Sequence, residues 1–126
     1  MENKIILKEL CYKVNGLLFK THNELGRCCR EKQYGDFLEE LLTRENIAFE
    51  REKQLPIKEI DNQRTNVVDF IIDNMLLIDL KAKSMVTKDD YYQMQRYLKA
   101  GNYKLGLIVN FRNLHLKPIR VIKYNS

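Results

Sequence analysis

The chain has 126 residues, of which 44% are hydrophobic and 31% charged, and its net charge is +5. This length and composition exclude a disordered chain and predict one soluble domain over residues 1–126. No apolar run is long enough to span a membrane, and the N-terminus lacks the apolar centre of a signal peptide. We therefore expect a cytoplasmic protein without a membrane partner.

Two amphipathic helices are predicted in the first third of the chain, because apolar residues recur there at helical spacing. The first runs towards Gly26, and its apolar face comprises Leu7, Leu10, Val14, Leu17 and Leu18. The second ends near Asn46, and its apolar face comprises Tyr34, Phe37, Leu38, Leu41 and Leu42. Glu31 lies three residues before Tyr34, so we expect its carboxylate at the head of that apolar face rather than on the solvent side.

Three strands are predicted next. The first covers residues 48–57 and has alternating character, which predicts that Phe49, Leu55 and Ile57 share one face. The second and third are almost continuously apolar and are therefore predicted to be buried; they cover residues 67–72 and 75–81.

The length of the loop between the second and third strands decides which side chains face each other. In a three-residue loop over residues 73–75, Asn74 would supply the left-handed conformation that such loops need. Asp69 and Asp79 would then lie opposite each other on one face of the sheet. A two-residue loop would place them on opposite faces. A shared site for the two acids therefore requires the longer loop.

A third helix and two more strands complete the prediction. Thr87 and Asp90 have the spacing of a capping box, so we expect a helix from there to Gly101. The last strands are expected at residues 105–111 and 119–124. The order helix-helix-β-β-β-helix-β-β predicts an α/β fold, in which helices flank a mixed sheet with a right-handed crossover.

Charged residues interrupt the apolar strands at Asp69, Asp79 and Lys81. Burial of such charges costs several kcal/mol unless they are paired or bound to a cation. Magnesium or manganese, held by a few carboxylates with open coordination positions, promotes phosphodiester hydrolysis. We expect Asp69, Asp79 and the Leu80 carbonyl to hold such an ion, with Glu31 as a further carboxylate acting directly or through water. Lys81 would orient the attacking water or balance charge on the scissile phosphate.

Gln93 and Tyr97 lie four residues apart on the third helix and share a face. If that helix lies beside the site, Gln93 would hold a metal-bound water or a phosphate, and Tyr97 would brace it or stack on a base. A partly buried tyrosine beside an incidental glutamine is the simpler explanation of this pair considered alone.

The C-terminal part of the chain is strongly basic. Residues 91–126 contain seven lysines and arginines and no acidic residue. This suits a polyanionic partner, and it suits a solvated basic surface equally well. The basic residues that we expect to contact nucleic acid are Lys83, Arg96 and Lys99.

Asp69 followed by Asp79-Leu80-Lys81 resembles the Asp…(Asp/Glu)-x-Lys signature of the PD-(D/E)XK nuclease superfamily. Gln93 with Tyr97 resembles the Gln-x-x-x-Tyr element of some of its exonucleases. From about residue 10 onwards the chain is similar to the small bacterial GxxExxY family, most clearly at residues 21–26, 28–34, 96–101, 105–111 and 116–117. The resemblance implies a restriction-endonuclease-like core and a metal-dependent nuclease site formed by Glu31, Asp69, Asp79, Lys81 and Gln93.

The chain departs from the family pattern at three positions. Cys28 stands at the glycine of the naming motif, so a backbone conformation that needs glycine would shift to Gly26. Val67 stands where an arginine is frequent, which removes a phosphate contact unless Arg64 replaces it. Asp79 stands where glutamate is frequent, and its shorter side chain would hold a metal closer to the strand.

Three functions are compatible with these patterns. The expected function is a magnesium- or manganese-dependent nuclease that acts on DNA in preference to RNA, with a homodimer as a further expectation. The alternative is a catalytically inactive nucleic-acid-binding or complex-forming module on the same fold. The third is a structural protein in which Asp79 and Lys81 form a buried ion pair. Glu24 is the reserve candidate if Glu31 points away from the site.

Overall fold

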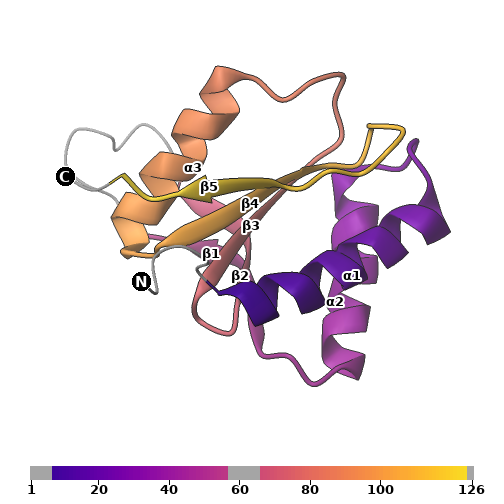
Figure 1. Ribbon diagram of the computed structural model, residues 1–126, viewed down its shortest axis with the longest axis horizontal. Helices are drawn as coiled ribbons and strands as arrows, with labels where there is room; N and C mark the ends of the chain where they lie inside the picture. Colours follow the sequence, from indigo (N-terminus) through magenta and orange to yellow (C-terminus); the bar gives the residue numbers. More distant parts are fainter. Residues whose placement is uncertain (1–6, 57–65, 125–126) are drawn as a thin grey trace.

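The computed structural model describes residues 7–56 and 66–124, which form the helices and strands of Figure 1. In chain order these are α1 (Lys8–Leu25), α2 (Glu31–Arg44), β1 (Phe49–Gln54), β2 (Val67–Ile72), β3 (Leu76–Lys81), α3 (Lys88–Gly101), β4 (Leu105–Asn110) and β5 (Ile119–Ile122). This confirms the predicted order of elements. None of the helices in the described part of the chain is long and apolar enough to cross a bilayer.

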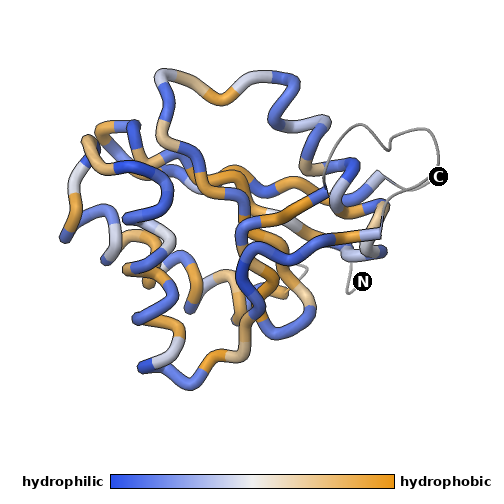
Figure 2. Tube along the Cα trace, turned by 180° about the vertical axis from the view of Figure 1, so that it is seen from behind, coloured by the Kyte–Doolittle hydropathy of each residue, from blue (hydrophilic) through white to orange (hydrophobic). Residues whose placement is uncertain are grey.

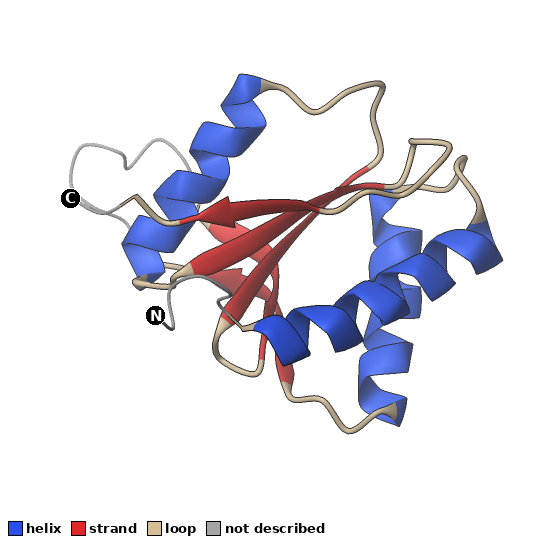
Figure 3. Cartoon of the chain, viewed as in Figure 1, coloured by secondary structure: helices blue, strands red, loops and turns tan. Residues whose placement is uncertain are grey.

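The strands form one sheet in the spatial order β1-β2-β3-β4-β5. β3 and β4 are parallel, whereas the other neighbouring pairs are antiparallel. α3 connects the two parallel strands, because a parallel pair cannot be joined by a tight turn. The predicted α/β fold, a restriction-endonuclease-like mixed sheet flanked by helices, is therefore confirmed (Figure 3).

Helices cover both faces of the sheet, so the strands are buried on two sides. α1 and α2 pack Leu18 and Tyr34 against Phe70 and other residues on one face. α3 packs Met94 and Leu98 on the opposite face. Hydrophobic residues accordingly follow the central strands, and hydrophilic residues follow the outer parts of the chain (Figure 2). This double burial explains why β2 and β3 are almost continuously apolar.

Both ends of α3 follow from local side-chain chemistry. The predicted capping box is present, and the backbone N–H of Thr87 donates a 2.8 Å hydrogen bond to Asp90 Oδ2. At the other end, Gly101 is the last helical residue, as predicted. The left-handed C-cap, however, is Asn102, with a φ of 58°. Asparagine tolerates this conformation better than most residues with a side chain.

The hairpin between β2 and β3 has the three-residue loop that a shared acidic site requires. Ile72 pairs with Leu76, and Asp73, Asn74 and Met75 form the turn. Asn74 is left-handed as expected, with a φ of 57°, but Asp73 is left-handed as well, with a φ of 53°. The register that places Asp69 and Asp79 on adjacent strands facing each other is therefore confirmed.

The predicted alternation of β1 is wrong. Phe49 packs on the α1/α2 side of the sheet, whereas Leu55 belongs to the core on the α3 side. The ladder between β1 and β2 skips Glu52, whose φ is 53°, and a left-handed residue interrupts the regular pleat. The strand is also shorter than expected, and Ile57 lies outside the described residues.

Candidate active site

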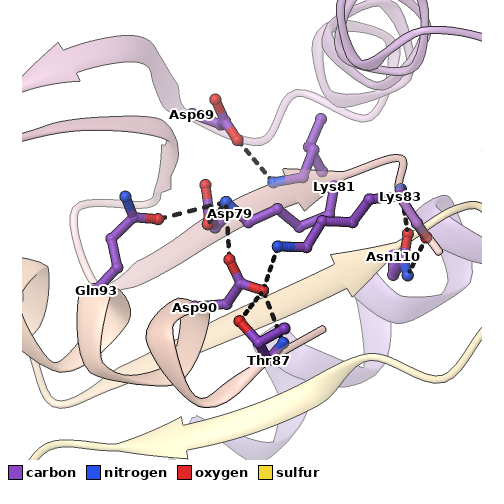
Figure 4. Close-up of polar contacts among 9 residues, drawn as sticks. Asp69, Asp79, Lys81, Lys83, Thr87, Asp90, Gln93 and Asn110 are labelled. Atoms are coloured by element: carbon purple, nitrogen blue, oxygen red, sulfur yellow. Dashed lines mark hydrogen bonds and ion pairs between the residues drawn. The ribbon is translucent and has the colours of Figure 1, made fainter. Parts of the chain in front are cut away.

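β2 and β3 separate at the end of the sheet where the acidic residues lie. Their last backbone pair is Phe70 with Ile78. Beyond it, the backbone N–H of Leu80 donates a 2.6 Å hydrogen bond to Asp69 Oδ2 (Figure 4). The carboxylate of Asp69 thus replaces the backbone acceptor that a continued ladder would supply. The Asp69 side chain is therefore held in the fork between β2 and β3, the place where the two strands stop pairing.

The carboxyl groups of Asp69 and Asp79 share this fork. Burial, a hydrogen bond with Asp79 and the charge of Asp79 raise the pKa of Asp69 to about 8. Asp79 is 5% exposed, and its Oδ2 atom lies within ion-pair distance of the Lys81 ammonium group. Ionisation of two carboxyl groups this close together costs free energy unless a positive charge lies next to them.

Lys81 is the cation that the chain itself provides. Its ammonium group lies 3.0 Å from Asp79 Oδ2, 3.3 Å from Gln93 Oε1 and 3.7 Å from Asp90 Oδ1. Burial lowers the pKa of Lys81, but the neighbouring negative charges, led by Asp79, outweigh burial and raise it. Lys81 is therefore charged and is held between β3 and α3, as Figure 4 shows.

Glu31 approaches the same fork from the α1/α2 side. It lies in the first turn of α2 and lines a cavity of about 190 Å³ together with Asp69, Leu80 and Glu52. Its negative charge is one of the influences that raise the pKa of Asp69. Glu24 is not among the described residues that line this cavity. Of the two glutamates considered from the sequence, Glu31 is the one that lies next to the aspartate pair.

The basic residues expected to contact nucleic acid lie in different environments. Lys83 pairs with Asp90, at 2.5 Å. Arg96 donates to Asn66 Oδ1 at 3.3 Å. Lys99 is exposed in the last turn of α3, about 9 Å along the helix axis from Gln93. Lys83 therefore shares a partner, Asp90, with the Lys81 ammonium group.

The expectation that Tyr97 stacks on a base is wrong for this structure. Its side chain belongs to the core on the α3 side and is 4% exposed. Burial and the charge of Asp79 raise its pKa to about 12, so the phenol is neutral. Tyr97 lies four residues after Gln93 on the same face of α3, so of the two roles considered for it, bracing Gln93 is the one that its burial allows.

Two acidic residues near the site were not identified as site residues from the sequence. Asp90 was expected only to cap α3, although its position three residues before Gln93 places both on one face of the helix. Glu52 lines the same cavity as Asp69, at the position that the β1–β2 ladder skips between the Arg51–Phe70 and Lys53–Val68 pairs. Helical spacing was a usable signal for Asp90. No signal in the sequence indicated Glu52, because strand pairing depends on the tertiary structure.

Comparison with known proteins agrees with this geometry. The family model described as the PD-(D/E)XK nuclease superfamily matches residues 8–122. The chain belongs to the PD-(D/E)XK nuclease superfamily. No curated protein and no solved structure gave a match. The matched region of this PD-(D/E)XK protein contains Asp69, Asp79 and Lys81, together with Glu31 and Gln93.

The residues in the fork fit a hard divalent cation. Within the described part of the chain, no group of three or more His, Cys, Asp or Glu side chains converges to form a metal site by itself. Magnesium, however, is usually held by one or two carboxylates, with water and substrate phosphates as its remaining ligands. The raised pKa of Asp69, caused by burial and by the neighbouring Asp79, marks a pair of acids that a cation would stabilise.

Proposed function

We propose that this PD-(D/E)XK protein is a magnesium- or manganese-dependent nuclease that hydrolyses phosphodiester bonds in DNA. The observation that carries the proposal is the close pair of carboxyl groups, half-buried Asp69 and buried Asp79, with the ammonium group of Lys81 3.0 Å from Asp79. Membership of the superfamily supports nucleic-acid hydrolysis, and its nucleases typically use divalent metals.

Each residue of the fork has a role in this proposal. Asp69 and Asp79 would hold the cation, with Glu31 and the Leu80 carbonyl as further oxygen donors. A bound divalent cation supplies Lewis-acid stabilisation of phosphoryl oxygens and lowers the pKa of a coordinated water. The Lys81 ammonium group neutralises charge that develops on the scissile phosphate.

Gln93 orients Lys81 by accepting a hydrogen bond from its ammonium group. Its Oε1 atom accepts a hydrogen bond from the Lys81 ammonium group, at 3.3 Å. This leaves the Gln93 amide NH₂ group available as a donor to a water or to a phosphate oxygen. An uncharged acceptor orients Lys81 without adding a further negative charge beside it.

The substrate class follows from charge. The basic segment over residues 91–126, which includes Arg96 and Lys99, supports a polyanion as the partner, as does Lys83. We propose DNA rather than RNA as the polyanion.

We also propose that the chain belongs to the GxxExxY branch, and the segment before α2 supports this proposal. The hydroxyl of Tyr34 donates a 2.6 Å hydrogen bond to the Gly26 carbonyl and accepts one from the Cys29 backbone N–H. The Tyr34 ring stacks on Phe111, with centroids 4.2 Å apart. The motif tyrosine therefore fixes the loop that leads to Glu31, which gives the motif spacing a physical purpose.

The deciding experiment incubates the purified protein with linear, circular and branched DNA, and with the matching RNA, in magnesium, manganese or chelator. Lys81→Ala is the test variant, and Lys104→Ala is the matched control, because Lys104 is an exposed lysine at the start of β4. We expect cleavage by the wild type and by Lys104→Ala only with metal, and none by Lys81→Ala. Retention of DNA without metal and after Asp69→Asn, with no cleavage, would instead identify an inactive binding module.

A further inference from the structure

One buried carboxylate next to the candidate active site has no role in the proposed chemistry. Asp90 is 7% exposed and lies in the first turn of α3. Its Oδ1 atom is 3.7 Å from the Lys81 ammonium group, and its Oδ2 atom is 2.5 Å from that of Lys83. One carboxylate thus faces two cations that belong to the end of β3 and the segment after it.

The position of Asp90 is fixed by the start of the helix. Its Oδ2 atom accepts hydrogen bonds from the backbone N–H of Thr87, at 2.8 Å, and from the Thr87 hydroxyl, at 3.3 Å. A side chain held by its own capping box loses little further freedom when it also pairs with lysines. Asp90 is therefore a rigid anchor rather than a mobile surface acid.

The backbone of Lys83 is fixed from the other side. Asn110, which is 3% exposed at the end of β4, accepts a hydrogen bond from the Lys83 N–H at 3.2 Å and donates one to the Lys83 carbonyl at 2.8 Å. With backbone and carboxylate both held, the Lys83 side chain has a defined direction. Figure 4 shows it converging with Lys81 on Asp90.

We propose that Asp90 is a positioning residue that holds Lys81 beside the Asp69–Asp79 pair and holds Lys83 next to it, so that two ammonium groups are presented together to one nucleic-acid backbone. Without this shared counter-ion the two lysines repel each other, and among the residues that the structure describes Asp79 and Gln93 are left to hold Lys81. This role rests on the proposed nuclease function, because the benefit of positioning the two lysines is a faster cleavage of the phosphodiester bond.

The test separates the charge of Asp90 from its capping role. Asp90→Asn keeps an oxygen acceptor for the Thr87 N–H but removes the negative charge, whereas Thr87→Ala weakens the cap and leaves the carboxylate in place. In metal-dependent DNA cleavage we expect Asp90→Asn to lower kcat about tenfold or more with KM changed less than about threefold. Thr87→Ala should lower Tm while its kcat stays within about twofold of wild type. Equal losses of kcat in both variants, or an unchanged kcat in Asp90→Asn, would overturn the proposal.

A second measurement does not depend on cleavage. Reductive methylation by formaldehyde, followed by peptide mass spectrometry, reports how firmly each lysine is held, with Lys88 and Lys104 as exposed references. We expect Asp90→Asn to accelerate modification of Lys81 and Lys83 about threefold or more relative to the references. Unchanged rates would refute the positioning role even if the wild type cleaves DNA. If the wild type cleaves nothing, the nuclease proposal fails, and these rates still decide whether Asp90 orders the two lysines.

Discussion

The Leu80 backbone N–H donates a 2.6 Å hydrogen bond to the Asp69 carboxylate just beyond the point where β2 and β3 stop pairing. The acid therefore has two functions at once, since it completes the edge of β3 and faces Asp79. This relationship explains how an apolar sheet tolerates an ionisable group at its fork. It also means that the charge of Asp69 can be removed without removing its hydrogen bond, which makes the following predictions testable.

Asp69→Asn should uncouple metal binding from stability. The asparagine oxygen can still accept from Leu80, and the repulsion with Asp79 disappears. We expect the metal-free variant to melt a few degrees above the metal-free wild type, and the stabilisation by magnesium to be lost. Cleavage should fall by more than the roughly 10–100-fold that is typical of losing a group that only supports a metal ligand. Thermal unfolding with and without magnesium measures the first two effects. An equal rise in Tm with magnesium in both proteins would contradict the assignment.

The metal-free protein should lose stability as the pH rises. The folded-state pKa of Asp69 is raised to about 8 from an ordinary 3.8, so the folded protein keeps a proton that the unfolded chain releases. The stabilisation is complete below the ordinary pKa and is lost as the pH rises through about 8. We expect the free energy of unfolding in urea to fall by on the order of a few kcal/mol between about pH 5 and about pH 9. Asp69→Asn is the control. If its free energy of unfolding fell with pH as steeply as that of the wild type, the effect would belong to another group.

Gln93→Ala and Gln95→Ala form a matched pair on α3. Gln93 bonds the Lys81 ammonium group, whereas Gln95 bonds the Ile122 carbonyl and the Tyr124 N–H. A hydrogen bond to a charged group is worth about 1.5–3 kcal/mol, so Gln93→Ala should lower kcat about tenfold to a hundredfold with little change in Tm. Gln95→Ala should cost about 1–3 kcal/mol of stability and leave kcat nearly unchanged. Steady-state kinetics and urea unfolding of both variants test this, and the reverse pattern would show that Gln93 is structural.

Glu31→Gln tests which glutamate acts with the aspartate pair. Glu31 lines the cavity beside Asp69, whereas Glu24 is exposed near the end of α1. We expect Glu31→Gln to raise the magnesium concentration needed for half-maximal cleavage by about tenfold or more, because a carboxylate near the cation is lost. Glu24→Gln should behave as wild type. Metal titrations of the cleavage rate provide the measurement, and a larger effect at Glu24 would reverse the assignment.

Sequence periodicity was sufficient where local interactions decide the structure. The Thr87–Asp90 capping box lies within one helical turn, and the asparagine-containing turn after β2 sets its own register. That register alone brought Asp69 opposite Asp79. The spacing from Tyr34 likewise placed Glu31 at the head of the second helix, but its side chain is exposed, so the expectation that it avoids the solvent side is wrong. Each of these features depends on residues only a few positions apart in the chain.

Non-local contacts decided the rest. The alternation expected for β1 failed because Glu52 is left-handed where the ladder with β2 skips it. Tyr97 was expected near a base but is buried against the sheet, since the packing of α3 decides which of its faces meets solvent.

The sequence by itself determined the order of elements, the hairpin register and the identity of the charged groups, because hydrophobic periodicity and turn chemistry act over a few residues. Only the tertiary structure decided that Asp90 forms ion pairs with both Lys81 and Lys83 and that Glu52 lines the cavity. The energy of a charge depends on which charges lie within a few ångströms of it, and chain separation does not specify that distance.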